Sequence, residues 1–575
     1  MPRPRRVRPR DRLTFALEDD APDLDPDLGA ESGPVPAGHP ASPSTADGAT
    51  TDETDRTAPA RRRRARTALA TVGVAAAVVV GMVVVDTMAA RPSIEALRRS
   101  PGGVLPVATA PSELWRVPGP TWGGIATLPG LLVVVRDDEA TAYDLDTGSP
   151  RWSVDVPAGS ACGDPLVGTE RGTTVPGDTL VCLTSDGPTL TTASPTGLPL
   201  TGPPTLVAGE PAVVTVLDAS GAVVATRTLD AARGWSSVGP DGTVARFRRV
   251  GGDPGGRLVD VDPASGRPTD LSGGLNVVVT LEDAATGDIL WEHELPFVGS
   301  EAAGGCQQYG TEDGTTFADL DGGRLDLVQG ELLVAHGCGV EAWFSHDGAR
   351  LDDPRSSTDG LVALPDGSIA RDPDGSWNGG WTAGDQPVTV TPALLDPDGT
   401  VLWEAPGRIL VPYATDGSAD ELVLVRRPAD LEAYDAAGTP RWTSSAASAP
   451  LLVYAVAGGT VVALRDTDSA LVGIDVETGH ELWSLTPNEV RAIDEGRGGS
   501  SDDLAPDVWF SRILTDGDRA FVVVASWSGS ASRVVALDLH DGRVAWRGDA
   551  TSAVTYLAVQ GRLLRVDDST VARLG

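Results

Sequence analysis

Lysine is absent from this chain of 575 residues, and methionine, histidine and cysteine are scarce. All 45 basic residues are arginine, and there are only three Met, six His and four Cys. An arginine-only basic set is typical of a GC-rich genome. Positive charge is also in deficit, because 81 acidic residues give a net charge of −36 at pH 7. Residues 1–66 are neutral in sum, so the excess lies in the remaining chain, which repels nucleic acid and anionic lipid. We therefore expect no nucleic-acid partner.

The residue patterns of common catalytic and metal sites are lacking as well. None of the six histidines stands at a metal-ligand spacing such as His-x-x-x-His. The sequence holds no Gly-x-Ser-x-Gly nucleophile elbow, no phosphate-binding glycine loop and no adjacent pair of cysteines. It therefore assigns no catalytic, cofactor-binding or metal-binding residue.

Long apolar runs are lacking except for one. The stretch "TALATVGVAAAVVVGMVVV", from Thr67 to Val85, carries no charge. At a rise of ~1.5 Å per residue it just crosses a hydrocarbon core of ~30 Å. The basic run at 61–66 precedes it, so the positive-inside rule places residues 1–66 in the cytoplasm and the body outside. We predict an uncleaved signal-anchor helix at 67–88 rather than a cleaved signal peptide, whose apolar core is usually about 7–15 residues long.

The rest of the chain divides by composition. Residues 1–66 predict a disordered cytoplasmic tail, because they are first basic and Pro-rich, then acidic, then rich in Pro, Ala, Ser and Thr. Residues 89–110 are expected to be a linker, followed by an extracytoplasmic body at 111–575. With 68 Gly and 45 Pro in the chain, short strands joined by turns are favoured over long helices.

The four cysteines are well separated, which suits two disulfides outside the cytoplasm. We favour the local pairs Cys162–Cys182 and Cys306–Cys338 over the other two pairings, because each pair would join neighbouring strands of one sheet. The alternative is four buried free thiols.

One motif recurs along the body. The copy "DVETGHELW" runs from Asp475 to Trp483, and two shorter copies have lost one residue in the turn. A decayed copy keeps Asp218 and Gly221 but has Ala225 where tryptophan is expected. The tryptophans that we expect to dock between sheets are Trp115, Trp152, Trp291, Trp403, Trp442, Trp483 and Trp546. The turn residues that we assign are Asp144, Gly148, Asp283, Gly287, Asp435, Gly438, Asp475, Gly479, Asp538 and Gly542.

Each residue type in the motif has a physical reason. Glycine supplies the positive φ of a tight hairpin turn, and the aspartate can accept hydrogen bonds from turn amides. The tryptophan lies on the outgoing strand, where it can wedge against the next sheet. A sheet of three or four strands cannot bury both faces alone, so repeated sheets must stack.

The two ends of the body predict that the stack is closed. "SELWRVP" at 112–118 is an outgoing strand with no partner before it, and 561–575 supplies incoming strands with no tryptophan strand after them. Pairing these ends would hide two sheet edges. The sequence therefore predicts an all-β propeller closed by an N-terminal strand.

The run Ala142-x-Asp144-x-x-Thr147-Gly148-x-x-x-Trp152 resembles the repeat of the pyrroloquinoline-quinone (PQQ) β-propeller superfamily. That superfamily includes quinoprotein dehydrogenases and BamB-type assembly lipoproteins, and the resemblance covers roughly residues 110–575. It implies eight blades, or seven.

The resemblance to the BamB type implies a non-catalytic binding or scaffold module for protein partners at the cell envelope. We therefore expect a single-pass membrane protein with its N-terminus inside and its propeller outside, with no enzyme activity and no cofactor. One alternative is a PQQ-dependent dehydrogenase, in which the family places PQQ and Ca²⁺ in the central funnel. Another is a ligand sensor that signals through the cytoplasmic tail.

Overall fold

The computed structural model is divided into two units, Met1–Val79 and Val80–Gly575, and all of the described residues belong to the second. The predicted cytoplasmic tail and the predicted membrane span at 67–88 lie outside the described residues. Within the described part, no helix combines the length and the apolar character needed to cross a membrane. The structure describes residues 92–120, 124–163, 177–185, 212–230, 234–251, 258–262, 267–268, 274–297, 306–310, 316–320, 325–328, 332–352, 360–364, 366–372, 391–445, 450–465, 467–494, 508–526, 533–548, 555–567 and 569–575.

The described part of the second unit consists mainly of strands, as predicted. Two short helical segments are described, at residues 92–99 and at α2 (Pro487–Asp494). Continuous apolar runs form central strands that are buried on both faces, such as β3 (Leu131–Arg136) and β35 (Arg519–Ser526). Outer strands alternate between exposed and partly buried residues, as β5 (Pro150–Asp155) does. This difference is expected where each sheet is sandwiched between two others and its last strand forms the rim.

The described residues form ten sheets, and nine of them follow one another along the chain. Given in hydrogen-bonded order, the first sheet is β2 (Ile125–Leu128), β3, β4 (Glu139–Asp144) and β5, and the second is β6 (Ala161–Cys162), β7 (Thr179–Ser185), β8 (Ala212–Asp218) and β9 (Val223–Leu229). The third sheet is β10 (Trp235–Val238), β11 (Thr243–Val250), β14 (Asn276–Asp283) and β15 (Ile289–Leu295), and the fourth is β18 (Leu325–Val328), β19 (Leu333–Gly337) and β20 (Val340–Phe344). The fifth sheet is β21 (Gly360–Ala363), β22 (Ile369–Asp372), β23 (Ala393–Leu395) and β24 (Val401–Glu404). The other four are β25 (Arg408–Leu410), β27 (Leu422–Arg426), β28 (Leu431–Asp435) and β29 (Pro440–Ser444); β26 (Ala414–Thr415), β30 (Pro450–Ala457), β31 (Thr460–Arg465), β32 (Leu471–Asp475) and β33 (Glu481–Leu485); β34 (Val508–Thr515), β35, β36 (Arg533–Asp538) and β37 (Val544–Arg547); and the closing sheet of β38 (Thr555–Val559), β39 (Arg562–Val566), β40 (Thr570–Leu574) and β1 (Glu113–Pro118).

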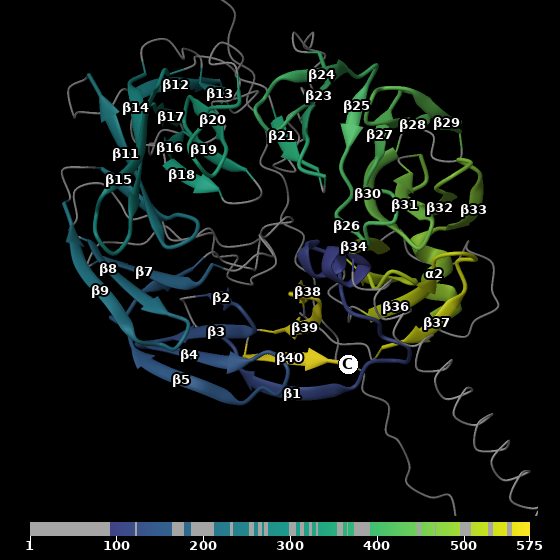
Figure 1. Cartoon of the computed structure of the whole chain (residues 1–575), viewed down its shortest axis with the longest axis horizontal. Helices are drawn as coiled ribbons and strands as arrows, with labels where there is room; N and C mark the ends of the chain where they lie inside the picture. The colour runs from purple at the N-terminus through teal and green to yellow at the C-terminus, as the bar shows by residue number, and fades with distance from the viewer. Residues whose placement is uncertain are drawn as a thin grey trace, which may run out of the picture. The chain divides into compact units, whose positions relative to one another are not determined.

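The closing sheet joins the two ends of the body, as the sequence predicts. Strand β1 pairs with β40, with Trp115 opposite Arg573 (Figure 1). Trp115 and Leu564 belong to the same buried cluster. Every neighbouring pair of the nine sheets shares such a cluster, from the β2–β5 sheet round to the closing sheet. The sheets therefore form a closed propeller circuit, whereas the expected count of eight or seven blades is not confirmed.

The tenth sheet is an insertion. It consists of β12 (Leu258–Asp262), β13 (Arg267–Pro268), β16 (Gln307–Gly310) and β17 (Thr316–Asp319). Its small core includes Val259, Val261 and Ala318, together with Cys306 and Cys338. The insertion therefore packs on the β18–β20 sheet through that core.

Both predicted disulfides are present, Cys162–Cys182 and Cys306–Cys338. The first joins facing residues of β6 and β7, as expected. The reason given for the second was wrong, because Cys306 directly precedes β16 of the insertion and Cys338 lies between β19 and β20. That bridge joins two sheets, since the insertion interrupts the simple succession of repeats.

The two ends of each sheet differ in what they carry. We call the end with the turn between the third and fourth strands the docking end. The connection between the first and second strands lies at the same end, because neighbouring strands are antiparallel. The other end, with the connection between the second and third strands, is called the far end.

Candidate functional site

The aspartate of each repeat turn closes that turn. Asp475 Oδ1 accepts hydrogen bonds from the Thr478 amide at 2.8 Å and from the Thr478 hydroxyl at 2.6 Å. Equivalent carboxylate-to-amide contacts occur at Asp144, Asp218, Asp283, Asp396, Asp435 and Asp538. Such a contact fixes the turn geometry, because it replaces a backbone hydrogen bond.

Hydrogen-bond donors around these turns stabilise the ionised carboxylates. The Arg151 guanidinium, 2.5 Å from Asp144 Oδ2, and the Thr147 amide and hydroxyl lower the pKa of Asp144 to about 2. The Thr478 hydroxyl and amide likewise lower the pKa of Asp475. Both turns therefore hold a negative charge at neutral pH.

The tryptophan of one sheet lies on the turn glycine of the next. At Gly148, whose φ is +67°, an added Cβ would lie 2.6 Å from Cγ of Trp115, so a side chain there would meet the indole. The same contact recurs between Trp152 and Gly221, Trp291 and Gly348, Trp403 and Gly438, Trp442 and Gly479, and Trp483 and Gly542. Glycine is therefore required twice over, by the backbone conformation and by the space that the indole takes.

The indole N–H adds a directional contact at several of these interfaces. It donates to the carbonyl of the residue after the turn aspartate, as Trp483 does to Leu539 O at 2.7 Å. Trp115, Trp152 and Trp442 donate in the same way to Leu145, Ala219 and Val476. Each of these indoles therefore joins two sheets by packing and by a hydrogen bond.

Arginine replaces tryptophan at one interface. Beyond Ala225, the Arg227 Nε donates to Ala284 O at 2.8 Å, and its guanidinium lies 3.2 Å from the Cβ that Gly287 lacks. The same guanidinium is 3.1 Å from Glu282, whose side chain is 1% exposed. Arg227 thus takes over both contacts of an indole, and the sequence motif did not reveal it. A long side chain two positions beyond the missing tryptophan was the only available signal.

The last docking tryptophan has a different acceptor. Trp546 donates to Val107 O at 3.0 Å, and Val107 lies in the segment that the sequence assigns to a linker. The Val107 amide in turn donates to Asp516 Oδ2 at 3.0 Å. We call residues 92–112, which lie along the docking end of the last three sheets, the strap.

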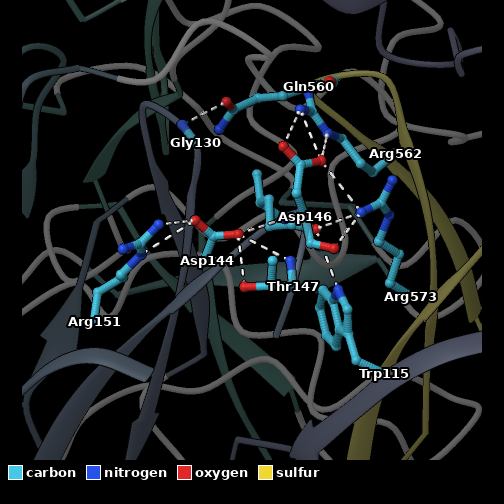
Figure 2. A network of polar contacts seen from close by, with 10 residues as sticks. Trp115, Gly130, Asp144, Asp146, Thr147, Arg151, Gln560, Arg562 and Arg573 are labelled. Atoms are coloured by element: carbon cyan, nitrogen blue, oxygen red, sulfur yellow. Dashed lines mark hydrogen bonds and ion pairs between the residues drawn. The ribbon is translucent and has the colours of Figure 1, made fainter. Parts of the chain in front are cut away.

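A polar network strengthens the closure between the closing sheet and the β2–β5 sheet (Figure 2). The Asp146 carboxylate accepts hydrogen bonds from Arg562 and is 3.2 Å from Arg573. Gln560 accepts from the Gly130 amide and donates to Leu128 O, both at 2.9 Å. These contacts hold together the first and the last sheet of the circuit.

No group of three or more His, Cys, Asp or Glu side chains that could hold a metal ion occurs in the part of the chain that the structure describes. His293, for example, lies against the rings of Trp291 and Phe344, and its Nε2 is 2.8 Å from Gly348 O. Its described contacts are those of a packing residue in an interface between sheets.

Comparison with known proteins places the repeats in a family. A family described as outer membrane protein assembly factor BamB matches residues 103–318 and 389–507. Among curated proteins, none matches the sequence of this chain. Similar solved structures include BamB from Moraxella catarrhalis, at 14% identity over 81% of this chain and 99% of that chain, with a TM-score of 0.34. They also include the quinohemoprotein alcohol dehydrogenase from Comamonas testosteroni, at 11% identity over 81% and 76%, with a TM-score of 0.31. A third is the dihydro-heme d1 dehydrogenase NirN, at 12% identity over 78% and 80%, with a TM-score of 0.29. Because the family match covers more than half of the residues, this chain belongs to the BamB-type family of PQQ-like repeat propellers.

Proposed function

We propose that this chain is a membrane-anchored, extracytoplasmic propeller that binds protein partners at the cell envelope without catalysing a reaction. The family match carries the proposal, because it covers most of the body and the family is described as an outer membrane protein assembly factor. The uncharged stretch at 67–85, preceded directly by the basic run at 61–66, supports one span with the propeller outside.

The contacts of the repeat residues agree with a scaffold. The turn aspartates bond to their own turns, and the tryptophans lie on the turns of the next sheet. Such interlocked sheets provide a rigid support, and the connections at their ends are free to vary. We infer that partners contact these connections and the rims.

The experiment is crosslinking of the full chain in its own cells, followed by mass spectrometry. Amine-reactive reagents are unsuitable, because the chain has no lysine. Reagents that couple carboxylates suit its 81 acidic residues. We expect one extracytoplasmic protein to be recovered repeatedly, with crosslinks in residues 111–575. Crosslinks confined to cytoplasmic proteins and to the tail would contradict the proposal and favour a sensor that acts through the tail.

A second assay addresses catalysis. The full chain is incubated with PQQ and Ca²⁺ and assayed for alcohol- or sugar-dependent dye reduction. We expect no reduction above that of the same mixture without protein. Substrate-dependent reduction would replace the scaffold proposal with a dehydrogenase.

A further inference from the structure

The strap is part of the propeller. Its Ser100 hydroxyl donates to Thr415 O at 3.0 Å and accepts from the Thr415 amide at 3.1 Å. Val104 donates to Thr515 O at 2.8 Å, and Leu105 donates to Gly561 O at 2.7 Å. These acceptors belong to β26, to the end of β34 and to the turn between β38 and β39, so the strap crosses three consecutive sheets.

The strap is also held by apolar contacts. Val104 is fully buried in a cluster with Leu514 and Phe521, and Leu97 is only 3% exposed. At Gly103 an added Cβ would lie 2.0 Å from Leu97 O, so the strap also folds closely on itself. A segment buried in this way does not behave as a flexible linker.

All of these contacts lie at the docking end. Thr515 precedes the turn from the first to the second strand of the β34–β37 sheet, and Gly561 occupies the same turn of the closing sheet. Val107 accepts the Trp546 indole, a role that turns between third and fourth strands have elsewhere. The chain therefore enters the propeller at its docking end.

The path from the membrane to the strap is short. The predicted span ends at residue 88 and the helical segment of the strap begins at residue 92, a reach of at most roughly 14 Å. Were residues 89–110 a flexible linker, their root-mean-square span would be about 26 Å and the propeller could turn freely. The bound strap removes that freedom.

We propose that the strap fixes the orientation of the propeller, with the docking end toward the membrane and the far end toward the cell exterior. This inference depends on the proposed membrane anchor and extends it. It assigns the docking end to the lipid side and leaves the far end and the rims to protein partners.

Energy transfer to the membrane tests the orientation. The full chain is placed in lipid nanodiscs that carry acceptor dyes on the headgroups. All four cysteines form disulfides, so an added cysteine is the single free thiol for a donor dye. Ala437→Cys puts the donor at the docking end of β28, and Ala429→Cys, also exposed, puts it at the far end of the same strand. The five-residue strand separates the two sites by about 17 Å.

A second pair of sites controls for tilt. Ser149→Cys and Asp138→Cys lie at the docking end and the far end of β4, in the β2–β5 sheet. We expect several-fold more transfer from Ala437→Cys than from Ala429→Cys, and the same sign for the second pair. Equal transfer within each pair, or more transfer from the far end, would overturn the inference.

A longer connection separates the role of the strap from that of the anchor. A flexible insertion of about 12 residues between 91 and 92 extends the reach to more than about 50 Å and leaves the strap contacts intact. We expect the transfer difference to disappear in this variant, and a difference that persists would contradict the role of the strap. Failure of the unmodified chain to stay with membranes after a carbonate wash would refute the anchor itself, and the orientation with it.

Discussion

Gly542 provides a direct test of docking between sheets. Its φ is +68°, and an added Cβ would lie 2.7 Å from Cγ of Trp483. In Gly542→Ala the left-handed backbone costs roughly 1–2 kcal/mol. Overlap with the indole costs about 1–3 kcal/mol more, because a packed interface must shift to admit a methyl group. We expect the variant to lose about 2–5 kcal/mol of unfolding free energy.

Gly459 is the matched control. Its φ is +73°, but no heavy atom lies within 4 Å of the position that a Cβ would take. Gly459→Ala therefore has the backbone cost alone, about 1–2 kcal/mol. The difference between the two variants isolates the contact with the indole.

A double-mutant cycle completes the measurement. Trp483 is 7% exposed and donates to Leu539 O, so Trp483→Ala should cost about 3–5 kcal/mol. In that background Gly542→Ala should cost only the backbone term, which gives a coupling of about 1–3 kcal/mol. The readout is urea unfolding followed by far-UV circular dichroism, because indole fluorescence changes with the substitution. Equal losses in Gly542→Ala and Gly459→Ala, or strict additivity with Trp483→Ala, would refute the docking argument.

Three further outcomes follow from other interfaces. Arg227→Ala should lower the free energy of unfolding by about 3 kcal/mol, because buried Glu282 loses its ion pair with Arg227, and adding Glu282→Gln should recover part of the loss. Replacing Cys306 and Cys338 by alanine should cost about 3–4 kcal/mol in urea unfolding, from the lost constraint on a 32-residue separation. The lowered pKa of Asp144 means that its contribution to stability is complete above the unfolded pKa, near 4, and is lost as pH falls toward about 2. Urea midpoints across this range should fall less steeply in Asp144→Asn, and an unchanged slope would contradict that role.

The closed circuit could be predicted because its determinants are local and repeated. The turn at Asp475 combines an acid, a glycine and a tryptophan at fixed offsets, and the physical role of each follows from its residue type. By the same reasoning, the strand at 113–118 has no partner before it in the sequence, and the C-terminal strands have no tryptophan strand after them. The two segments were therefore expected to pair, as they do. The Cys162–Cys182 pair followed from the expectation that each disulfide joins neighbouring strands of one sheet, whereas the Cys306–Cys338 pair was predicted correctly for a reason that proved wrong.

Copies of the repeat that have diverged from the motif were harder to recognise in the sequence. At Gly287 the contact comes from Arg227, and the nearest neighbour of Gly399 is Leu351, at 3.6 Å. The interface requires a side chain that covers the turn glycine and, in most cases, donates to a carbonyl. Different residue types meet that requirement, so the tryptophan pattern shows fewer repeats than the nine sheets of the circuit.

The role of the strap in the closure of the propeller can be understood only from the assembled sheets. Closure by β1 places the start of that strand and the C-terminus at the docking end of the closing sheet, where Ser112 and Gly575 exchange backbone hydrogen bonds. That sheet therefore has no turn between its third and fourth strands, and Trp546 of the preceding sheet has no such turn to dock on. The carbonyl of Val107 takes the place of the missing acceptor. In this propeller the segment before the first strand supplies the acceptor that the closing sheet lacks, and the same segment leads to the predicted membrane span.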